Sequence, residues 1–334
     1  MDHPQGAQGS EEILQLTSRG HGFIFFTPFC ILEMNQIKSL KITTLAENYA
    51  FGRGIGQWGL SFLLELVDAK GEPRKVVLDT GRNREALLHN AKVIKEDFSD
   101  VDCVVLSHGH LDHTATTTEI VKASGGVKVY GHPHTFTERV SENREGKRRR
   151  TDPPKGQGIS EIEAAGGTVI LNEGPVEVVP GLSTTGEVKR RSFERGGAPP
   201  NQGRWIMMDD REETDDQIMD DLSLWTDVEG VGPWVITGCA HAGPVNTLLQ
   251  VQELSGFMEI NGFIGGTHLI GRPDDYVQRT IDEIAKLRPK LISPCHCTGF
   301  KATAKFWQAF PEEFVLNNSL RIIEAGKMPR HRII

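Results

Sequence analysis

The chain of 334 residues contains no apolar stretch near the roughly 20 residues that a membrane-spanning helix requires. The nearest candidate, residues 22–32, is short and is interrupted by Pro28. It follows an acidic leader with Glu11 and Glu12 rather than a basic one, which argues against a signal peptide. We therefore expect no membrane association.

Cysteine is scarce, and its number and spacing argue against two common roles, a disulfide framework and a structural zinc site. The five cysteines are Cys30, Cys103, Cys239, Cys295 and Cys297. An odd number in a chain of this length is not typical of a secreted disulfide framework. No pair has the Cys-x-x-Cys spacing of a structural zinc site. We expect a reducing compartment and a cytoplasmic location.

Several nucleotide and nucleophile motifs are also missing. No phosphate-binding P-loop and no Gly-x-Ser-x-Gly nucleophile motif occurs, and the glycines at 52, 54 and 56 do not open a helix after a strand. Lys and Arg number 37 against 45 Asp and Glu, giving a net charge of −8, which argues against a general nucleic-acid binder.

The pattern that is present alternates sheet-forming runs with helices. We expect residues 1–36 to be a flexible N-terminal extension and residues 37–334 to form one domain. The sequence from Met34 onward is more typical of the beginning of a domain, so we hypothesise that native translation starts at Met34. Strands are predicted at 40–47, 62–68, 75–78, 101–106, 127–130, 233–237, 257–264, 290–293 and 320–324, and helices at 84–97, 116–123, 245–254, 274–287 and 302–310. This rhythm indicates a layered α/β domain with its chemistry at one edge of the sheets.

Two polar segments interrupt this rhythm. Residues 141–158 contain four consecutive basic residues, 147–150, followed by prolines and glycines, and we interpret them as a solvated loop or lid. A clamp for an anionic substrate is the alternative. Residues 209–221 contain eight acidic residues and are expected to form a solvated face.

The strongest chemical signal is the sequence His108-x-His110-x-Asp112-His113, which follows a predicted buried strand. Neutral imidazoles and carboxylates are good ligands for Zn²⁺, Mn²⁺ or Fe. His108 and His110 can serve one metal ion, while Asp112 and His113 serve a second. Four ligand-capable residues within six positions predict a two-metal centre.

One motif cannot complete two metal sites, so other strand ends must contribute. His241 and His296 lie in small-residue loops after apolar strands and are expected to be ligands. His268 has a similar place and is expected to be a ligand, a partner of a ligand or a substrate contact. Weaker candidates also follow strands or lie close to these histidines: Asp79, to orient a ligand histidine, and Asp221 and Cys239, as further ligands.

Together these segments resemble the metallo-β-lactamase superfamily over about residues 42–324. A closer resemblance is to its branch of dihydropterin ribofuranosylaminobenzene phosphate synthases. The similar segments are 58–61, 78–81, 107–113, 185–188, 237–243, 265–269 and 295–299. The resemblance implies a four-layer αββα sandwich. It departs from the wider superfamily where the usual third histidine is missing from 181–186, and where Cys239 stands at the place of the usual bridging aspartate. We expect His241 to replace one of these functions.

The resulting hypothesis is a metal-dependent hydrolase that uses metal-activated water, with two divalent ions, Zn²⁺ being the first expectation and Mn²⁺ or Fe the alternatives. Asp112 and His268 are the catalytic candidates. The resemblance implies a small anionic or ester-like substrate, such as a pterin or a phosphorylated ribosyl compound, and a synthase-like transferase is open as well. Alternatives are a promiscuous phosphodiesterase or lactonase and a non-catalytic metal-dependent binding protein. A di-iron redox scaffold is disfavoured because no flavodoxin-like domain is appended. A homo-oligomer is also an open expectation.

Overall fold

A computed structural model describes residues 35–199, 203–209 and 212–327, all of which belong to one compact unit. Most of the predicted N-terminal extension, including Met34, lies outside the described residues. No described helix has both the length and the apolar character needed to cross a membrane.

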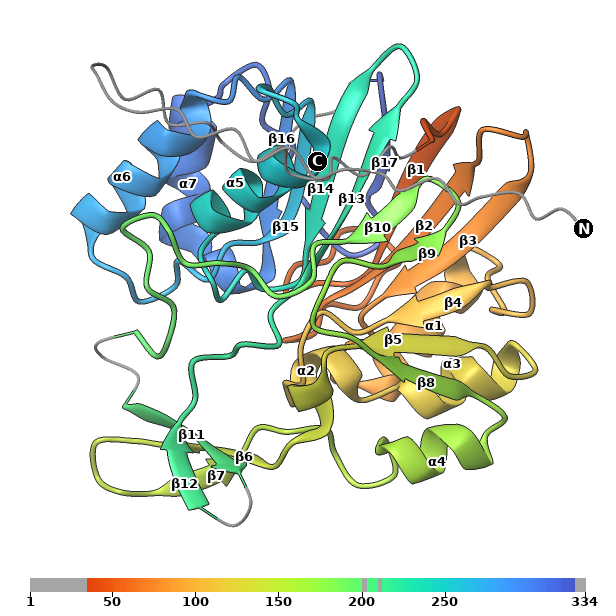
Figure 1. Cartoon of the computed structure of the whole chain (residues 1–334), viewed down its shortest axis with the longest axis vertical. Helices are drawn as coiled ribbons and strands as arrows, with labels where there is room; N and C mark the ends of the chain where they lie inside the picture. The colour runs from red at the N-terminus through yellow and green to blue at the C-terminus, as the bar shows by residue number, and fades with distance from the viewer. Residues whose placement is uncertain (1–34, 200–202, 210–211, 328–334) are drawn as a thin grey trace, which may run out of the picture. The chain divides into compact units, whose positions relative to one another are not determined.

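Two large sheets form the centre of the described chain (Figure 1). The first has seven strands in the order β17 (Ile322–Glu324), β1 (Ser39–Ala46), β2 (Ser61–Val67), β3 (Pro73–Leu78), β4 (Cys103–Val105), β5 (Lys128–Gly131) and β8 (Thr168–Leu171). The second has six, in the order β16 (Leu291–Cys295), β15 (Gly262–Gly266), β14 (Gly232–Thr237), β13 (Ser223–Val228), β10 (Leu182–Thr184) and β9 (Glu177–Val179).

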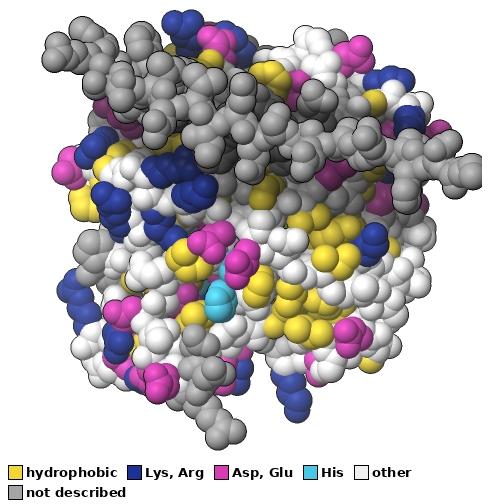
Figure 2. Space-filling model, in the orientation of Figure 1, with side chains coloured by type: hydrophobic (Ala, Val, Ile, Leu, Met, Phe, Trp, Pro, Cys, Tyr) yellow, Lys and Arg dark blue, Asp and Glu magenta, His cyan; other side chains and the backbone are white. Residues whose placement is uncertain are grey.

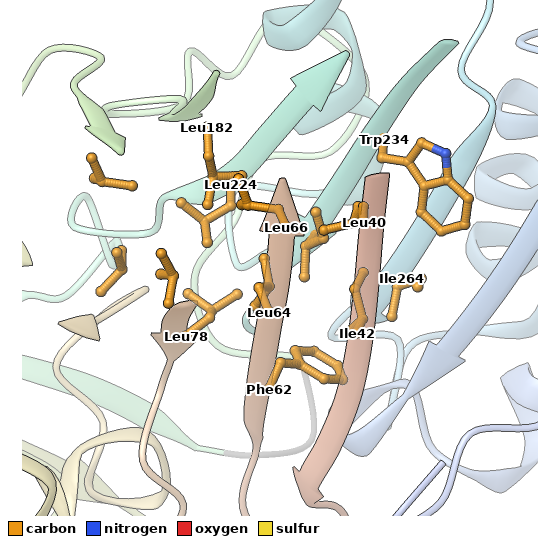
Figure 3. Close-up of a cluster of buried hydrophobic side chains, with 14 of the residues drawn as sticks. Leu40, Ile42, Phe62, Leu64, Leu66, Leu78, Leu182, Leu224, Trp234 and Ile264 are labelled. Carbon is orange, nitrogen blue, oxygen red and sulfur yellow. The ribbon is translucent and has the colours of Figure 1, made fainter. Parts of the chain in front are cut away.

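The main core lies between these sheets, because successive strand residues point to opposite faces. In β2, Phe62, Leu64 and Leu66 enter this core, where they meet Leu224 and Ile264 of the second sheet (Figure 3). Both sheets are therefore apolar on their facing sides.

Each sheet is also apolar on its other side, which helices cover. Leu63 of β2 points away from the main core and joins a second cluster with residues of α1 (Arg84–Val93), α3 (Thr117–Ala123) and α4 (Ile159–Ala164). Val235 of β14 joins a third cluster with α5 (Pro244–Ser255), α6 (Asp274–Ala285) and α7 (Phe300–Ala309). Figure 1 shows these two helix groups on opposite sides of the sheets. The predicted αββα sandwich is confirmed.

The predicted helices are all present, with shifted ends. Helix α1 ends at Val93, four residues before the predicted end, because Lys95 and Phe98 have left-handed backbones with φ of 63° each. The short helices α2 (Leu111–Thr114) and α4, and the 3₁₀ turns η1 (Pro133–Phe136) and η2 (His296–Thr298), were not predicted.

A third, smaller sheet was not predicted either. It has the order β12 (Glu212–Asp215), β11 (Arg204–Asp209), β6 (Arg139–Glu142) and β7 (Arg148–Arg150), all antiparallel. The segment 141–158, expected to be a loop or lid, thus contributes to a hairpin instead of a plain loop. The expectation that 209–221 forms a solvated face is wrong at Asp216, Asp220 and Asp221, whose side chains are buried.

Candidate metal centre

The predicted site residues follow the ends of neighbouring parallel strands. The strands β3 and β4 are parallel, as are β14, β15 and β16, so the carboxyl ends within each group lie at one edge of a sheet. The loop after β4 carries the histidine motif. The loops after β14, β15 and β16 carry His241, His268 and His296. The packed sheets bring these loops together.

One group of possible ligand atoms is centred on His108. Its Nε2 lies 3.0 Å from Nδ1 of His110 and 3.2 Å from Nε2 of His241. His108, His241 and Cys239 offer ligand atoms within 4.8 Å of one another. Ligand atoms around a tetrahedral zinc ion, each at about 2.0–2.1 Å, are about 3.3 Å apart. The nitrogen spacing therefore fits a metal ion.

A second group is centred on His113. Its Nε2 lies 3.2 Å from Nε2 of His296 and 3.1 Å from Sγ of Cys239. The carboxylate of Asp112 is 3.6 Å from the same His296 nitrogen. Cys239 belongs to both groups, at the position between them. Asp221, the other candidate for a bridging ligand, is in neither group found among the described residues. Its Oδ2 accepts a hydrogen bond from the Ala242 amide.

The protonation of four histidines in the cluster favours metal binding. Burial and the neighbouring histidines lower the pKa of His108 and His241 well below the usual value, and burial lowers that of His110 to about 4 and that of His296 to about 3. These imidazoles are neutral at pH 7, which is the form that coordinates metals.

His113 is held by a carboxylate from the first sheet. Its Nδ1 lies 2.6 Å from Oδ2 of Asp79, which also accepts the Ser107 hydroxyl at 2.7 Å. Burial alone would lower the pKa of His113, but Asp79 and Asp112 outweigh it and raise it to about 9. With Nδ1–H donating to Asp79, Nε2 is directed towards His296 and Cys239.

We expect Asp79→Asn to weaken metal affinity by about 10–100-fold, the usual cost of losing a hydrogen-bonding partner of a ligand histidine. An asparagine amide would face the Nδ1–H of His113 or the donors of Ser107, so one hydrogen bond is lost. The measurement is competition with a chelator at pH 7. The control is Asp68→Asn, a buried strand-end aspartate that accepts the Lys70 and Glu72 amides. Equal affinity in Asp79→Asn and wild type would contradict this role.

A buried ion pair supports the backbone of the motif, and sequence reasoning missed it. The Gly109 amide donates to Oδ2 of Asp220 at 2.7 Å, and Arg139 Nη2 donates to Oδ1 of Asp220 at 2.6 Å. Burial alone would raise the pKa of Asp220, but Arg139 and the Gly109 amide contribute to lowering it. A Cβ on Gly109 would lie 2.0 Å from the Thr135 carbonyl oxygen, so only glycine fits there. In the sequence, the adjacent pair Asp220–Asp221 just before a strand was the signal that could have indicated this buried ion pair.

The loop of His296 has its own support, also missed. The buried carboxylate of Glu47 accepts the His296 amide at 2.8 Å, and Asn48 Nδ2 donates to the His296 carbonyl at 2.9 Å. His296 has a φ of 52°, and Asp79 and His268 have φ of 58° and 46°. Left-handed backbones at residues other than glycine persist only where the surroundings enforce them, and they concentrate at functional sites.

His268 lies at the wall of the cluster rather than within either ligand group. Its ring centroid is 4.2 Å from that of His241 and 5.3 Å from that of Trp205. Its buried Nδ1 has no hydrogen-bond partner among the described residues. Trp205, from β11, also packs against His110 and His241 and was not singled out in the sequence. On the face shown in Figure 2, histidine surface is limited to one small group.

Known proteins resemble this chain in both sequence and fold. A family model described as the Beta-lactamase superfamily domain matches residues 74–208. The 7,8-dihydropterin-6-methyl-4-(beta-D-ribofuranosyl)-aminobenzene-5'-phosphate synthase of Methanocaldococcus jannaschii is 30% identical over 298 residues, which cover 88% of this chain and 99% of that protein. An uncharacterized protein of the same organism is 29% identical over 270 residues, covering 80% and 94%.

The crystal structure of Tm1679, described as a metal-dependent hydrolase of the beta-lactamase superfamily, matches with a TM-score of 0.70 and 23% identity, covering 86% of this chain and 100% of that chain. At this identity the match supports the fold. The chain belongs to the metallo-β-lactamase superfamily and, within it, to the branch that contains the synthase. Membership implies divalent metal binding, and the histidine and cysteine groups provide donors for it.

Proposed function

We propose that the protein is a metal-dependent enzyme with two divalent ions, Zn²⁺ first among them, and that it acts on a small anionic or ester-like substrate. The observation that carries this proposal is the pair of buried ligand groups joined at Cys239. His108, His110 and His241 would hold one ion, and Asp112, His113 and His296 the other. When bound, the ions would supply Lewis acidity and lower the pKa of water.

The chain's own residues would then orient the reactants. Asp112 lies at the cavity, where its carboxylate can accept a hydrogen bond from the attacking group as well as serve as a ligand. Burial lowers the pKa of His268 to about 3. Its ring is therefore neutral at pH 7 and can exchange a hydrogen bond with the substrate. Trp205 packs against His110 and His241, where its ring would limit the access of water.

The reaction class is hydrolysis in this proposal, with a synthase-like transfer to a pterin as the alternative. The transfer is supported by the name of the relative, a synthase of a compound that contains dihydropterin, aminobenzene and ribofuranosyl phosphate units. A phosphodiesterase or lactonase activity is a further alternative and would use the same centre. A non-catalytic metal-dependent binding protein is the alternative of another class. A cytoplasmic location and a homo-oligomer remain predictions.

The test is metal analysis joined to an assay panel. The purified full chain is depleted of metal, reloaded with Zn²⁺, Mn²⁺ or Fe²⁺, and assayed on phosphodiesters, lactones and pterin precursors with a ribosyl phosphate. We expect two equivalents of metal and turnover of at least one class that disappears on chelation and returns with metal. Two bound metals without turnover of any class would favour a binding protein.

A further inference from the structure

A cavity of about 510 Å³ opens beside the metal centre, and the third sheet forms part of its wall. Its lining includes His110, Asp112, His241, His268 and His296 from the centre. The sheet adds Ser141, Arg149 and Trp205. Cavities of this size hold small molecules, and a few placed polar groups fix their orientation. Residues of the third sheet are therefore placed to contact whatever the centre acts on.

Strand pairing decides which side chains of this sheet face the cavity. Ser141 of β6 is directly opposite both Arg149 of β7 and Trp205 of β11. Residues opposite one another across a sheet project from the same face. The row Arg149, Ser141 and Trp205 thus faces the cavity, while Arg148 and Arg150, one position away in β7, project from the other face.

The basic side chains on the two faces of this sheet differ in their ion pairing. On the outer face, Arg148 pairs with Glu142 and Glu213, and Arg150 pairs with Asp152. On the cavity side, Arg149 and Lys147 form no ion pair with any carboxylate in the part of the chain that the structure describes.

A third cation reaches the cavity from the first large sheet. Arg82, in the loop after β3, lines it, and its side chain also forms no ion pair with a carboxylate of the described residues. Asp112, already a candidate ligand, is the single acidic residue of the described lining. Three exposed cations without a described ion pair thus line one cavity beside the candidate metal centre, and together they favour the binding of an anion there.

We propose that Arg149, Lys147 and Arg82 form an anion subsite that binds the phosphate of an organic phosphate ester. The subsite deepens the proposed function and rests on it for the identity of the substrate. Three cations suit a doubly charged phosphate, and the planar guanidinium groups match its oxygens with paired hydrogen bonds. Trp58 and Trp205 also line the cavity and offer ring faces for a flat group attached to that phosphate.

The test uses the zinc-loaded full chain and phenyl phosphate as the probe, with phenol as its uncharged counterpart. Binding is followed by calorimetry. Arg149→Gln is expected to raise the Kd for phenyl phosphate about tenfold, as a lost charge-assisted hydrogen bond does, without changing phenol binding. Lys147→Gln should act in the same direction, and Arg149→Lys should restore part of the affinity. Added salt should weaken phenyl phosphate binding more in wild type than in Arg149→Gln.

Arg148→Gln is the matched control, because it removes the same charge from the neighbouring position on the outer face. It should leave the Kd unchanged. Equal losses in Arg148→Gln and Arg149→Gln, or wild-type affinity in both Arg149→Gln and Lys147→Gln, would overturn the subsite. Metal content and turnover are measured separately. Selective loss of phosphate binding in Arg149→Gln, without turnover of any substrate by wild type, would defeat the proposed reaction and keep the subsite.

Discussion

Arg139→Met is expected to lower the free energy of unfolding by about 3–5 kcal/mol, the cost of removing one partner from a buried ion pair. The Arg139 side chain is 1% exposed, and Nε donates to Asp216 at 2.8 Å while Nη2 donates to Asp220 at 2.6 Å. Methionine fills a similar volume but leaves both carboxylates buried without a cation. Denaturant unfolding of the metal-depleted protein measures the loss.

The same substitution should also weaken metal binding, because Asp220 anchors the Gly109 amide inside the histidine motif. Arg148→Met is the control: its ion pairs with Glu142 and Glu213 are exposed, and such pairs contribute at most about 1 kcal/mol. Adding Asp216→Asn and Asp220→Asn to Arg139→Met should recover part of the stability by removing the uncompensated charges. Equal stability of the Arg139→Met and Arg148→Met variants would refute this role for the buried pair.

Cys239→Ala is expected to reduce the affinity for the second metal ion by more than the roughly 10–100-fold that loss of an outer partner costs. Sγ of Cys239 belongs to both ligand groups, so its removal takes a donor from each. Burial raises the pKa of the Cys239 thiol well above its usual value, and a bound cation would oppose that by stabilising the thiolate. Metal titration of variant and wild type measures the change.

Cobalt substitution provides a spectroscopic test of Cys239 as a ligand. The cobalt-loaded wild type should show a thiolate-to-cobalt charge-transfer band that Cys239→Ala lacks. Cys239→Asp should lack the band yet retain both ions, because a carboxylate can bridge two metals. Cys297→Ala is the matched control, since that buried thiol accepts the His268 amide at 3.3 Å but is in neither ligand group. A band that survives in Cys239→Ala and disappears in Cys297→Ala would assign the thiolate to Cys297 and contradict the prediction.

Local sequence patterns predicted much of the fold and revealed the histidine motif. A short, nearly continuous apolar run bounded by turn residues indicates a strand buried on both faces, as in β2. The spacing of His108, His110, Asp112 and His113 is equally local, so their joint chemistry was predictable from the chain. His241 and His296 were predictable as strand-end residues, and the structure brings both beside the motif.

Contacts between distant segments were not predictable in the same way. Cys239 and His113 are 126 positions apart, and no local pattern distinguishes a packed thiol from one that meets a ligand nitrogen. The acidic run at 209–221 has the composition of a solvated segment. Only packing against Arg139, 77 and 81 positions earlier, explains why Asp216 and Asp220 are buried.

The sequence by itself determined the layered α/β class, because that class depends on side-chain periodicity. It also contains the motif segments whose resemblance indicated the superfamily and the candidate metal-binding motif, because short-range spacing is visible in the chain. Only the tertiary structure decided that 139–150 and 204–215 pair into a third sheet beside the metal centre. It also decided which arginine of 148–150 faces the cavity. Pairing between remote strands sets that register, and a shift of one residue would exchange Arg149 for its neighbours.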